Sequence, residues 1–519
     1  MINAVDREIP DELLKGGKEV YHGNFYMDGK YVKKDSPRTK RCETPRDSKI
    51  CKSIREACEK CGAHDGMTFS FHTEFRNGDY VASMVAKVLV EEMGLKDLTV
   101  AATSLGNAQD IIADYIEDNK IIGIQTSGVR GRIGEVISAG KLKTPAIIRS
   151  HGGRPRAIEA GEVHIDIAFL AASTSDCYGN AKGTGGKNNC GSMGFAVTDS
   201  HYADHVVVIT DTIIDFPNLP APISSIDVDC VCVVDSVGDP AKISTSEARM
   251  TDNPRELMMA ENVANIIAAT PYFKTGYSFQ TGVGGPSLAV TRFLETHMVE
   301  KDITMGFALG GMGSAICQLQ DKGLVKHILD TQDFDKGAIE HLATHPNHHE
   351  ICLSQYANPS NKGAYVNKLD FVVLAALEID THFNVNVITG SDGVLRGAPG
   401  GHPDTAAGSK CCIIVTPLVR GRMATVCKNV VTVTTPGDCV DVLVTDYGTA
   451  VNPLRLDLIE CLDKAGIAHV TIESLQEKAY GLVGTPDDLE WEDKVIAIVE
   501  ARDGTILDVV RKIKPLQLD

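Results

Sequence analysis

The sequence lacks the features that mark membrane-spanning, secreted and nucleic-acid-binding proteins. It contains no apolar run of about 18 residues, so we expect no membrane-spanning helix. Residues 1–26 are polar and rich in charge, unlike a secretory leader, so we predict a cytoplasmic protein. The formal net charge is −18, which argues against nucleic acid or an anionic membrane surface as a partner.

A disulfide framework and a metal motif are also missing. The 15 cysteines are an odd number scattered along the chain, which indicates reduced thiols. Cys58 and Cys61 have the spacing of half a zinc site, but a lone pair supplies only two of four ligands. His348 and His349 are adjacent and so do not have the i, i+4 spacing of a metalloprotease helix. We therefore predict no metal.

What the sequence does contain is a regular alternation of β-prone and helical segments. In the first half, helical patterns such as 78–93 and 106–118 separate β-prone runs at 68–71, 98–102, 121–126, 146–149, 165–171, 205–209 and 228–234. A helix from Pro254 to Ala269 opens a second series, with runs at 277–280, 304–309, 371–377, 412–415, 430–434, 440–444 and 469–472. Such alternation is typical of parallel sheets.

Length and composition agree with more than one domain of this kind. The 519 residues are 43% apolar, and single cores stop growing near about 250–300 residues. We predict an α/β fold with two α/β domains, each with a largely parallel sheet flanked by helices. The expected boundaries are a polar arm at 1–50, a first domain at 51–240 and a second at 241–519.

Gly-rich turns recur where strands meet helices. In residues 277–293, Gly282, Gly284 and Gly285 follow a β-prone run, and Pro286 suits the first turn of the next helix. The start of such a helix offers free N–H groups and partial positive charge to an anion. Similar turns lie at 127–132, 150–154, 309–314 and 389–404, and none matches a nucleotide-binding motif. The recurrence favours an anionic substrate and acyl chemistry.

Ionisable side chains beside these turns are the candidate ligands of such an anion. Arginine matches carboxylates with a planar fork of donors, and two or three of the nearby arginines are expected to bind substrate. These are Arg76, Arg130, Arg132, Arg154, Arg396, Arg420 and Arg422. His72, His151 and His402 are candidate proton donors or orienting groups, and Glu378, after a buried-looking strand, is either a base or nucleophile or a structural acid.

Longer blocks of sequence resemble a known family. The chain is similar to class I coenzyme A transferases, and over nearly its whole length to the citrate lyase alpha subunit family. The blocks that carry the resemblance are 65–76, 150–154, 165–169, 281–285, 377–386, 390–397 and 399–402. The resemblance implies a two-domain coenzyme A transferase fold and the exchange of acetate for citrate on a carrier thioester.

The partners and the cofactor are likewise implied by the resemblance. The expected partners are a beta (lyase) subunit and a gamma (acyl carrier) subunit in an oligomeric complex, with citrate and acetate as substrates. No cofactor is expected on this chain itself. It would act on the carrier's prosthetic group, which derives from dephospho-coenzyme A, with coenzyme A or acetyl-coenzyme A as a surrogate.

One departure from the wider superfamily concerns the nucleophile. Many coenzyme A transferases place a glutamate where this chain has Gly310, and no carboxylate lies within three residues on either side. A glutamyl thioester from that position is therefore impossible, and we expect a citrate carboxylate to attack the acetyl thioester directly. We predict Gly284, Gly285, Gly310 and Gly311 as oxyanion donors, with Glu378 and His402 as further catalytic candidates and His72, Arg76, Arg130, Arg132, His151, Arg154 and Arg396 as substrate ligands.

Gly282, Gly397, Gly400 and Gly401 are predicted to face the prosthetic group. Two alternatives stay open at this point. One is a related acyl-coenzyme A transferase or a citramalate lyase alpha subunit. The other is a non-catalytic scaffold subunit, a role in which the polar arm would bind partners.

Overall fold

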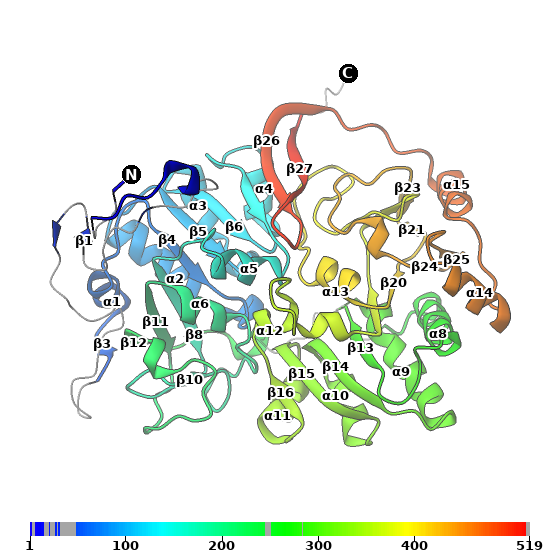
Figure 1. Ribbon diagram of the computed structural model, residues 1–519, viewed down its shortest axis with the longest axis horizontal. Helices are drawn as coiled ribbons and strands as arrows, with labels where there is room; N and C mark the ends of the chain where they lie inside the picture. The colour runs from blue at the N-terminus through cyan, green and yellow to red at the C-terminus, as the bar shows by residue number, and fades with distance from the viewer. Residues whose placement is uncertain are drawn as a thin grey trace. The chain divides into compact units, whose positions relative to one another are not determined.

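The computed structural model describes residues 1–2, 6–14, 20, 26–27, 30–31, 48–243, 251–282 and 284–514 (Figure 1). The chain divides into two compact units, 1–41 and 42–519. In the described part of the first unit, a 3₁₀ turn spans Asp11–Leu14, and β1 (Tyr26–Met27) pairs with β2 (Lys30–Tyr31). Most of the predicted arm lies outside the described residues, so its role stays a prediction.

The first large sheet of the second unit has ten strands in the order β27-β26-β7-β6-β5-β4-β8-β11-β12-β3. Every neighbouring pair is parallel except β26 and β27. The strands are β3 (Ile50–Cys51), β4 (Thr68–Phe71), β5 (Leu98–Ala102), β6 (Ile121–Thr126), β7 (Ala146–Ile148), β8 (Ile167–Ala172), β11 (His205–Thr210), β12 (Cys230–Val233), β26 (Trp491–Glu500) and β27 (Ile506–Ile513).

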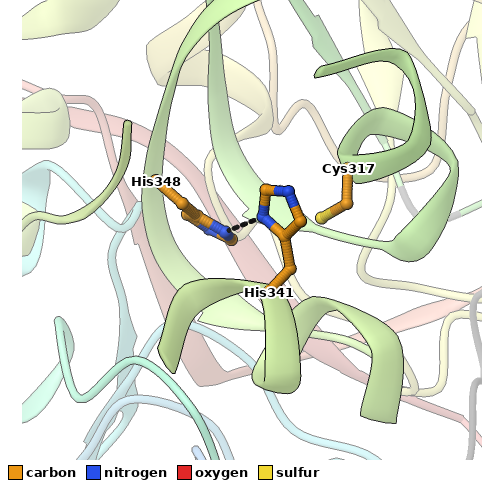
Figure 2. Close-up of side chains that lie close together, drawn as sticks. All are labelled: Cys317, His341 and His348. Carbon is orange, nitrogen blue, oxygen red and sulfur yellow. Dashed lines mark hydrogen bonds between the residues drawn. The ribbon is translucent and has the colours of Figure 1, made fainter. Parts of the chain in front are cut away.

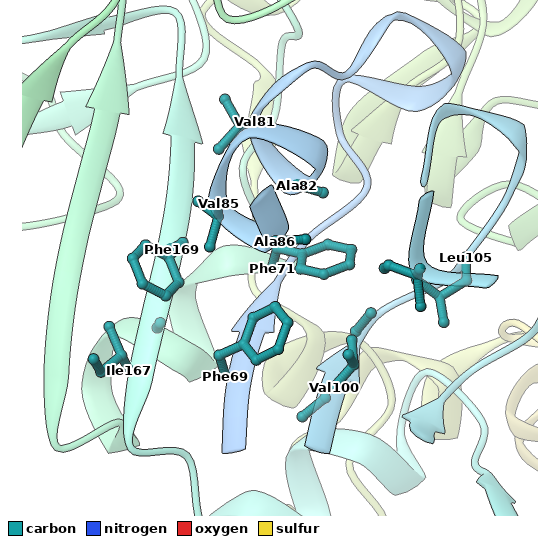
Figure 3. Close-up of a cluster of buried hydrophobic side chains, with 14 of the residues drawn as sticks. Phe69, Phe71, Val81, Ala82, Val85, Ala86, Val100, Leu105, Ile167 and Phe169 are labelled. Atoms are coloured by element: carbon teal, nitrogen blue, oxygen red, sulfur yellow. The ribbon is translucent and has the colours of Figure 1, made fainter. Parts of the chain in front are cut away.

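Helices cover this sheet, because parallel strands buried on both faces need crossover connections. They are α1 (Ile54–Lys60), α2 (Val81–Lys87), α3 (Ile111–Glu117), α4 (Gly131–Ser138), α5 (Gly153–Glu159) and α6 (Ala196–Tyr202). Figure 3 shows α2 with its apolar side chains beside those of β4, β5 and β8. Phe69 and Phe169 meet edge to face at 6.5 Å, and burial of each such ring contributes about 1.5–3 kcal/mol to stability.

The second large sheet has eight strands in the order β16-β15-β14-β13-β17-β20-β24-β25. All pairs are parallel except β24 and β25. The strands are β13 (Ser278–Thr281), β14 (Met305–Met312), β15 (Val325–Asp333), β16 (His348–Glu350), β17 (Phe371–Leu374), β20 (Cys411–Val415), β24 (Val442–Thr445) and β25 (Gly448–Val451). The predicted α/β class, with large and largely parallel sheets flanked by helices, is confirmed.

Helices flank the second sheet as well, and α8 and α9 pack against each other (Figure 1). These helices are α8 (Pro254–Ala269), α9 (Gly285–Glu300), α10 (Ser314–Asp321), α11 (Lys336–Thr344), α12 (Leu353–Ala357), α13 (His402–Gly408), α14 (Leu456–Ala465) and α15 (Ile472–Val483). A small sheet of β19 (Val385–Asn386), β18 (Glu378–Asp380) and β23 (Val426–Cys427) stands beside it. Among the described residues, no helix is both long and apolar enough to cross a membrane.

Two predicted strands are wrong. Residues 430–434 form no strand, because the Val431 and Val433 N–H groups bond to the Glu378 and Asp508 carboxylates rather than to a neighbouring strand. Residues 469–472 lead into α15, where the Thr471 hydroxyl caps the helix by accepting from the Ser474 N–H. The sequence pattern also failed to indicate β15 and β16.

The C-terminal hairpin belongs to the first sheet. Strand β26 pairs in parallel with β7, and Arg149 donates to both carboxylate oxygens of Glu500 at 2.6 and 3.0 Å. In Figure 1 the red hairpin lies beside α4 of the first half. Residues 491–513 therefore extend the sheet of the opposite half of the sequence, and the predicted boundaries at 50 and 240 remain predictions.

Candidate functional site

A cavity of about 670 Å³ lies at the carboxyl ends of parallel strands from both large sheets. From the first half, the loops after β4, β5, β6 and β7 contribute to its wall, with Thr73, Arg76, Asn77, Ser104, Asn107, Gln109, Arg130 and His151. From the second half come the ends of β13, β14, β15 and β17 and the turn before α13, with Gln280, Gly282, Gly284, Gly311, Gln332, Phe334, Ala375, Gly400 and His402. Its volume is in the range of small-molecule sites.

Hydrogen bonds join the part of the cavity wall from the first half of the chain to the part from the second half. We call the boundary between these two parts the seam. The Gln332 side-chain amide donates to the Thr73 carbonyl oxygen at 3.0 Å, and the His151 N–H donates to the Gly400 carbonyl oxygen at 2.8 Å. A Cβ on Gly128 would lie 2.2 Å from the side chain of Ala398, so glycine permits this close approach. The cavity is thus a fixed feature of how the two sheets meet.

Arg76 and Arg130 are the positively charged residues of the described cavity wall. The Arg76 guanidinium lies 5.0 Å from the ring centre of Phe334, which also lines the cavity. Its backbone has φ +53°, an uncommon value for a residue other than glycine, and such outliers cluster at functional sites. Arg130 is exposed and caps α4, with its N–H donating to the Leu105 carbonyl oxygen at 2.9 Å. Both arginines were predicted from their positions beside Gly-rich turns, although the net charge of the chain is negative.

The predicted Gly-rich turn delivers the start of α9 to the same cavity. Gly282 and Gly284 line it, and Gly284 caps the helix with Pro286 in the first turn. The first intrahelical bond runs from the Leu288 N–H to the Gly284 carbonyl oxygen at 3.0 Å, so the preceding N–H groups have no acceptor inside the helix. They carry the partial positive charge of a helix of four turns.

The turn at the end of β14 requires glycine for packing reasons. Gly310 has φ +102°, and a Cβ there would lie 2.6 Å from the side-chain nitrogen of Gln280. A Cβ on Gly311 would lie 2.1 Å from the Phe334 ring. The ladder with β15 shifts register between these two glycines. Gly311 lines the cavity, and Gly310 lies behind Gln280, which lines it.

The two predicted histidines of the cavity wall are both neutral. Burial, together with the charges of Arg154 and Arg130, lowers the pKa of His151 to about 3, and burial lowers the pKa of His402 to about 4. His402 uses both ring nitrogens, since Nδ1 is 2.7 Å from the Thr435 hydroxyl and Nε2 is 3.0 Å from the Ala375 carbonyl oxygen. The geometry fits an orienting role for His402.

Several reactive residue types are absent from the described cavity wall, and this limits its chemistry. Among the described residues that do, there is no aspartate, glutamate, lysine or cysteine. The polar groups are arginines, neutral histidines, amides, hydroxyls and backbone N–H groups. Such a wall can bind carboxylates and stabilise an oxyanion, but it offers no carboxylate or thiol to form an acyl-enzyme.

Four predicted substrate ligands lie outside this wall. Arg132 forms ion pairs with acids of α3, and Arg396 pairs with Asp392 at the surface. Arg154 is buried and donates to both oxygens of Asp199 at 2.6 and 2.8 Å. His72 is buried against Glu74, and burial lowers its pKa to about 3.

Three further predicted residues, Glu378, Gly397 and Gly285, do not line the cavity. Glu378 is buried in β18, where its carboxylate accepts from the Asn386 amide at 2.8 Å, and burial raises its pKa. The Gly397 carbonyl oxygen accepts from the Val129 N–H at 3.1 Å across the seam. Gly285 is the first residue of α9 and follows the cavity-lining Gly284. Gly400 and Gly401 line the cavity, and their contact with a prosthetic group stays a prediction.

Sequence reasoning missed the amide side chains of the wall. Asn107, Gln109 and Gln280 are neutral and occur within a predicted helix or strand, and Gln332 lies in β15, which the sequence pattern did not indicate. The oxygen of Gln280 is buried without a hydrogen-bond partner among the described residues, while its nitrogen donates to the Tyr356 hydroxyl at 2.8 Å. The only available signal was position, since Gln280 ends a predicted strand directly before a Gly-rich turn.

Comparisons with known proteins identify the family to which the chain belongs. Residues 47–513 match the family model described as citrate lyase, alpha subunit. The citrate lyase alpha chain of Haemophilus influenzae is 50% identical over 471 residues, which cover 91% of this chain and 94% of the relative. That of Klebsiella pneumoniae is 51% identical over 469 residues, covering 90% and 92%.

Solved structures give the same result. A crystal structure from Streptococcus mutans, described as an alpha subunit of citrate lyase in complex with citrate, has a TM-score of 0.90 and 47% identity and covers 99% of this chain and 100% of the other. A malonate decarboxylase alpha subunit from Acinetobacter baumannii has a TM-score of 0.63 at 16% identity over 84% of this chain and 87% of its own, which shows a shared fold alone. The chain belongs to the citrate lyase alpha subunit family.

Proposed function

We propose that the protein is the transferase of a citrate lyase complex, which exchanges acetate for citrate on the thiol of a carrier's prosthetic group. The observation that carries this proposal is the cavity wall, where two arginines and the start of α9 converge without any side-chain carboxylate among the described lining residues. The relative from Streptococcus mutans was solved with citrate, which supports a tricarboxylate as the ligand.

Citrate recognition rests on Arg76, Arg130 and the amide side chains around them. Citrate carries three negative charges at neutral pH, and guanidinium groups pair with carboxylates through two parallel hydrogen bonds. Neutral His151 adds a polar contact without a charge. Gln280 and Gln332 line the cavity, and their side-chain oxygens are the proposed orienting groups for the central part of the ligand.

The reaction proceeds by direct attack of one substrate on the other. A citrate carboxylate oxygen attacks the acetyl thioester carbonyl, the carbon–sulfur bond breaks, and a citryl–acetyl anhydride and a thiolate form. The thiolate then attacks the citryl carbonyl carbon, and acetate leaves. Each step passes through an oxyanion, for which the N–H groups at the start of α9 and at Gly311 are the proposed donors.

The wall can supply the barrier reduction that this scheme needs. Holding acid and thioester together contributes up to about 7–11 kcal/mol relative to free encounter. Each oxyanion donor adds about 2.7–4 kcal/mol by comparison with single-donor deletions in other enzymes. The arginines offset the repulsion between citrate and the developing thiolate.

The substrate test uses the purified chain with acetyl-coenzyme A as the surrogate donor and a panel of acids. Citrate, citramalate and simple dicarboxylates are compared by the ratio kcat/KM, with release of acetate as the readout. We expect citrate to be preferred. Preference for citramalate would assign the related lyase, and no exchange with any acid would support a scaffold.

The role of Glu378 is tested by Glu378→Gln, followed by hydroxylamine treatment during turnover. Because Glu378 is buried in β18 and does not line the cavity, we expect exchange to continue and no labelled glutamate to form. Loss of exchange together with a labelled Glu378 in the wild-type chain would replace direct attack by an acyl-enzyme scheme.

The remaining elements of the proposal concern the complex. A beta subunit that cleaves the citryl thioester and a gamma subunit that carries the thiol are the proposed partners. Gly400 and Gly401 line the cavity and are the proposed contacts of the carrier's prosthetic arm. Gel filtration of the chain mixed with carrier and lyase subunits tests this assembly.

A further inference from the structure

A second cluster of reactive side chains lies apart from the cavity, at the β16 edge of the second sheet. Five of the 16 histidines of the chain fall within residues 325–350. Two of them, His341 of α11 and His348 of β16, meet Cys317 of α10 (Figure 2). Each offers a nitrogen or sulfur atom, and these atoms lie within 4.8 Å of one another. None of the three residues lines the proposed active site.

The spacing within the cluster is close to that of a metal site. The Nδ1 atoms of His341 and His348 form a hydrogen bond of 2.9 Å (Figure 2), and Cys317 and His348 are buried. In a tetrahedral zinc site, Zn–N bonds of about 2.0–2.1 Å place two ligand nitrogens about 3.3 Å apart. A small outward shift of either imidazole therefore opens the position for an ion. The two imidazoles and one thiol form the mixed nitrogen and sulfur set that zinc prefers.

The second nitrogen of each imidazole faces a carboxylate. His348 Nε2 lies 3.3 Å from Asp330 Oδ2, and His341 Nε2 lies 3.4 Å from Asp321 Oδ1. Metal-binding histidines commonly donate their other N–H to a carboxylate, which fixes the tautomer and strengthens the ligand. The carboxylates that would support a zinc site are thus in place behind both rings.

Two buried ring nitrogens of the cluster lack a well-formed hydrogen bond. Within the described residues, His348 Nε2 and His341 Nε2 lie within 3.4 Å of a carboxylate oxygen but do not meet hydrogen-bond geometry with it. The His348 and Asp330 side chains have no solvent exposure. Buried polar groups without partners cost free energy, and a bound ion would reduce that cost by fixing the protons of the rings. An ion on Nδ1 would leave the proton on His348 Nε2, where Asp330 can accept it.

The thiol and the ring of His341 differ in access. Cys317 is buried, and a divalent ion would bind it as the thiolate by displacing the thiol proton. His341 is partly accessible, with 10% of its side chain exposed, so an ion has a route of entry.

We propose that Cys317, His341 and His348 bind one zinc-class divalent ion, which ties α10 and α11 to the β16 edge of the sheet. Water takes the fourth position. Strand β15 runs beside this site, and Thr331 and Gln332 at its end, together with the following Phe334, line the cavity wall. The ion would therefore fix one wall of the proposed active site from behind. This differs from the expectation of no metal, because residues from three separate elements build the site.

The test is titration of the full-length, chelator-treated chain with Co²⁺, which reports sulfur ligation by a thiolate-to-cobalt charge-transfer band. We expect about one Co²⁺ per chain with this band, competed away by Zn²⁺, and a rise in Tm when either ion is added. Cys317→Ser should lose the band, and His341→Gln should lose stoichiometric binding. Circular dichroism verifies that both variants fold.

His327→Gln is the matched control, because His327 pairs with His349 in the same region but does not belong to the cluster. It should retain the band and the stoichiometry. A band that persists in Cys317→Ser, cobalt binding that is lost in His327→Gln but kept in His341→Gln, or no stoichiometric binding by the wild-type chain would each overturn the proposal.

Discussion

At the scale of single residues, the guanidinium groups of Arg76 and Arg130 are the formal positive charges of the described cavity wall. A charged hydrogen bond is worth about 1.5–3 kcal/mol, so removing one partner weakens binding about tenfold to a hundredfold. We predict that Arg76→Ala and Arg130→Ala each raise KM for citrate by about this factor. Steady-state exchange kinetics measure it.

Arg396→Ala is the control for charge removal. Its guanidinium pairs with Asp392 at the surface, and neither side chain lines the cavity. KM for citrate should stay within about twofold of the wild-type value, since exposed ion pairs contribute little. Equal effects of all three substitutions would mean that the net charge of the chain, not the cavity, governs citrate affinity.

The buried histidines set how stability depends on pH. His151 has an ordinary pKa of 6.5 in the unfolded chain and about 3 in the fold. Below pH 6.5 the unfolded state therefore binds a proton at His151 that the folded state does not bind. The free energy of unfolding decreases on acidification as a result. Asp79 acts in the opposite sense, because burial raises its pKa to about 6 and favours the folded state at low pH.

We predict that His151→Gln loses less stability than the wild-type chain between pH 7 and pH 5. The difference in slope is at most about 1.4 kcal/mol per pH unit for one group. Urea unfolding at a series of pH values measures it, with His64→Gln as an exposed control. Parallel slopes for His151→Gln and wild type would show that His151 titrates normally in the fold.

At the scale of elements, the start of α9 is the proposed source of oxyanion donors. Gly284 has φ −68° and ψ 143°, the conformation that a residue before proline adopts, so proline fits at position 285. Gly285→Pro removes one N–H and leaves the helix intact, whereas Gly285→Ala keeps the N–H. We predict a loss of about 10²–10³ in kcat for the proline variant.

The comparison of these two variants isolates the donor from the side chain. Single-turnover exchange and thermal unfolding are measured for both. The alanine variant should keep most of its activity, and both should keep a Tm near the wild-type value. If the proline variant were as active as the alanine variant, the Gly285 N–H would have no part in the reaction.

Elements also show what could be predicted from the sequence. Strands β4, β5 and β6 and helix α8 were located to the residue, because apolar runs bounded by turns carry a strong local signal. Strand β15 was missed, since Lys326, His327, Asp330 and Asp333 break its apolar pattern. The strand predicted at 430–434 is wrong because the Val431 and Val433 N–H groups bond to distant side chains, which no local pattern reveals.

The same limit applies to the site. Glycine turns identified Gly282, Gly284, Gly311 and Gly400, because glycine is required wherever backbone must approach closely. Arginine positions were less informative. Arg132 and Arg154 also stand beside such turns, but their partners in α3 and α6 are fixed only by tertiary packing. Among the amide residues of the wall, only Gln280 carried a local signal, its position at the end of a predicted strand before a Gly-rich turn.

At the scale of the whole molecule, the C-terminal hairpin joins the last residues of the described chain to the first sheet. Glu500 is 13% exposed at its side chain and binds Arg149, which is 6% exposed. Removing one partner of a buried pair leaves an uncompensated charge and costs about 3–5 kcal/mol. We predict that Glu500→Ala lowers the free energy of unfolding by about 3–5 kcal/mol, which urea unfolding measures as a lower midpoint.

Glu490→Ala is the matched control in the same hairpin. Glu490 forms an exposed pair with Lys514, so its loss should change stability by less than about 1 kcal/mol. A Glu500→Ala chain as stable as the Glu490→Ala chain would show that the hairpin contributes little to the first sheet.

The central claim is that the acyl group passes from one substrate to the other without a carboxylate of the protein. The most direct measurement is one turnover of the enzyme with acetyl thioester and citrate labelled with ¹⁸O in its carboxylates. Direct attack transfers one citrate oxygen to the departing acetate, so the first acetate released should contain ¹⁸O. First-turnover acetate without label would contradict the claim, because its oxygen would then have come from a carboxylate of the protein.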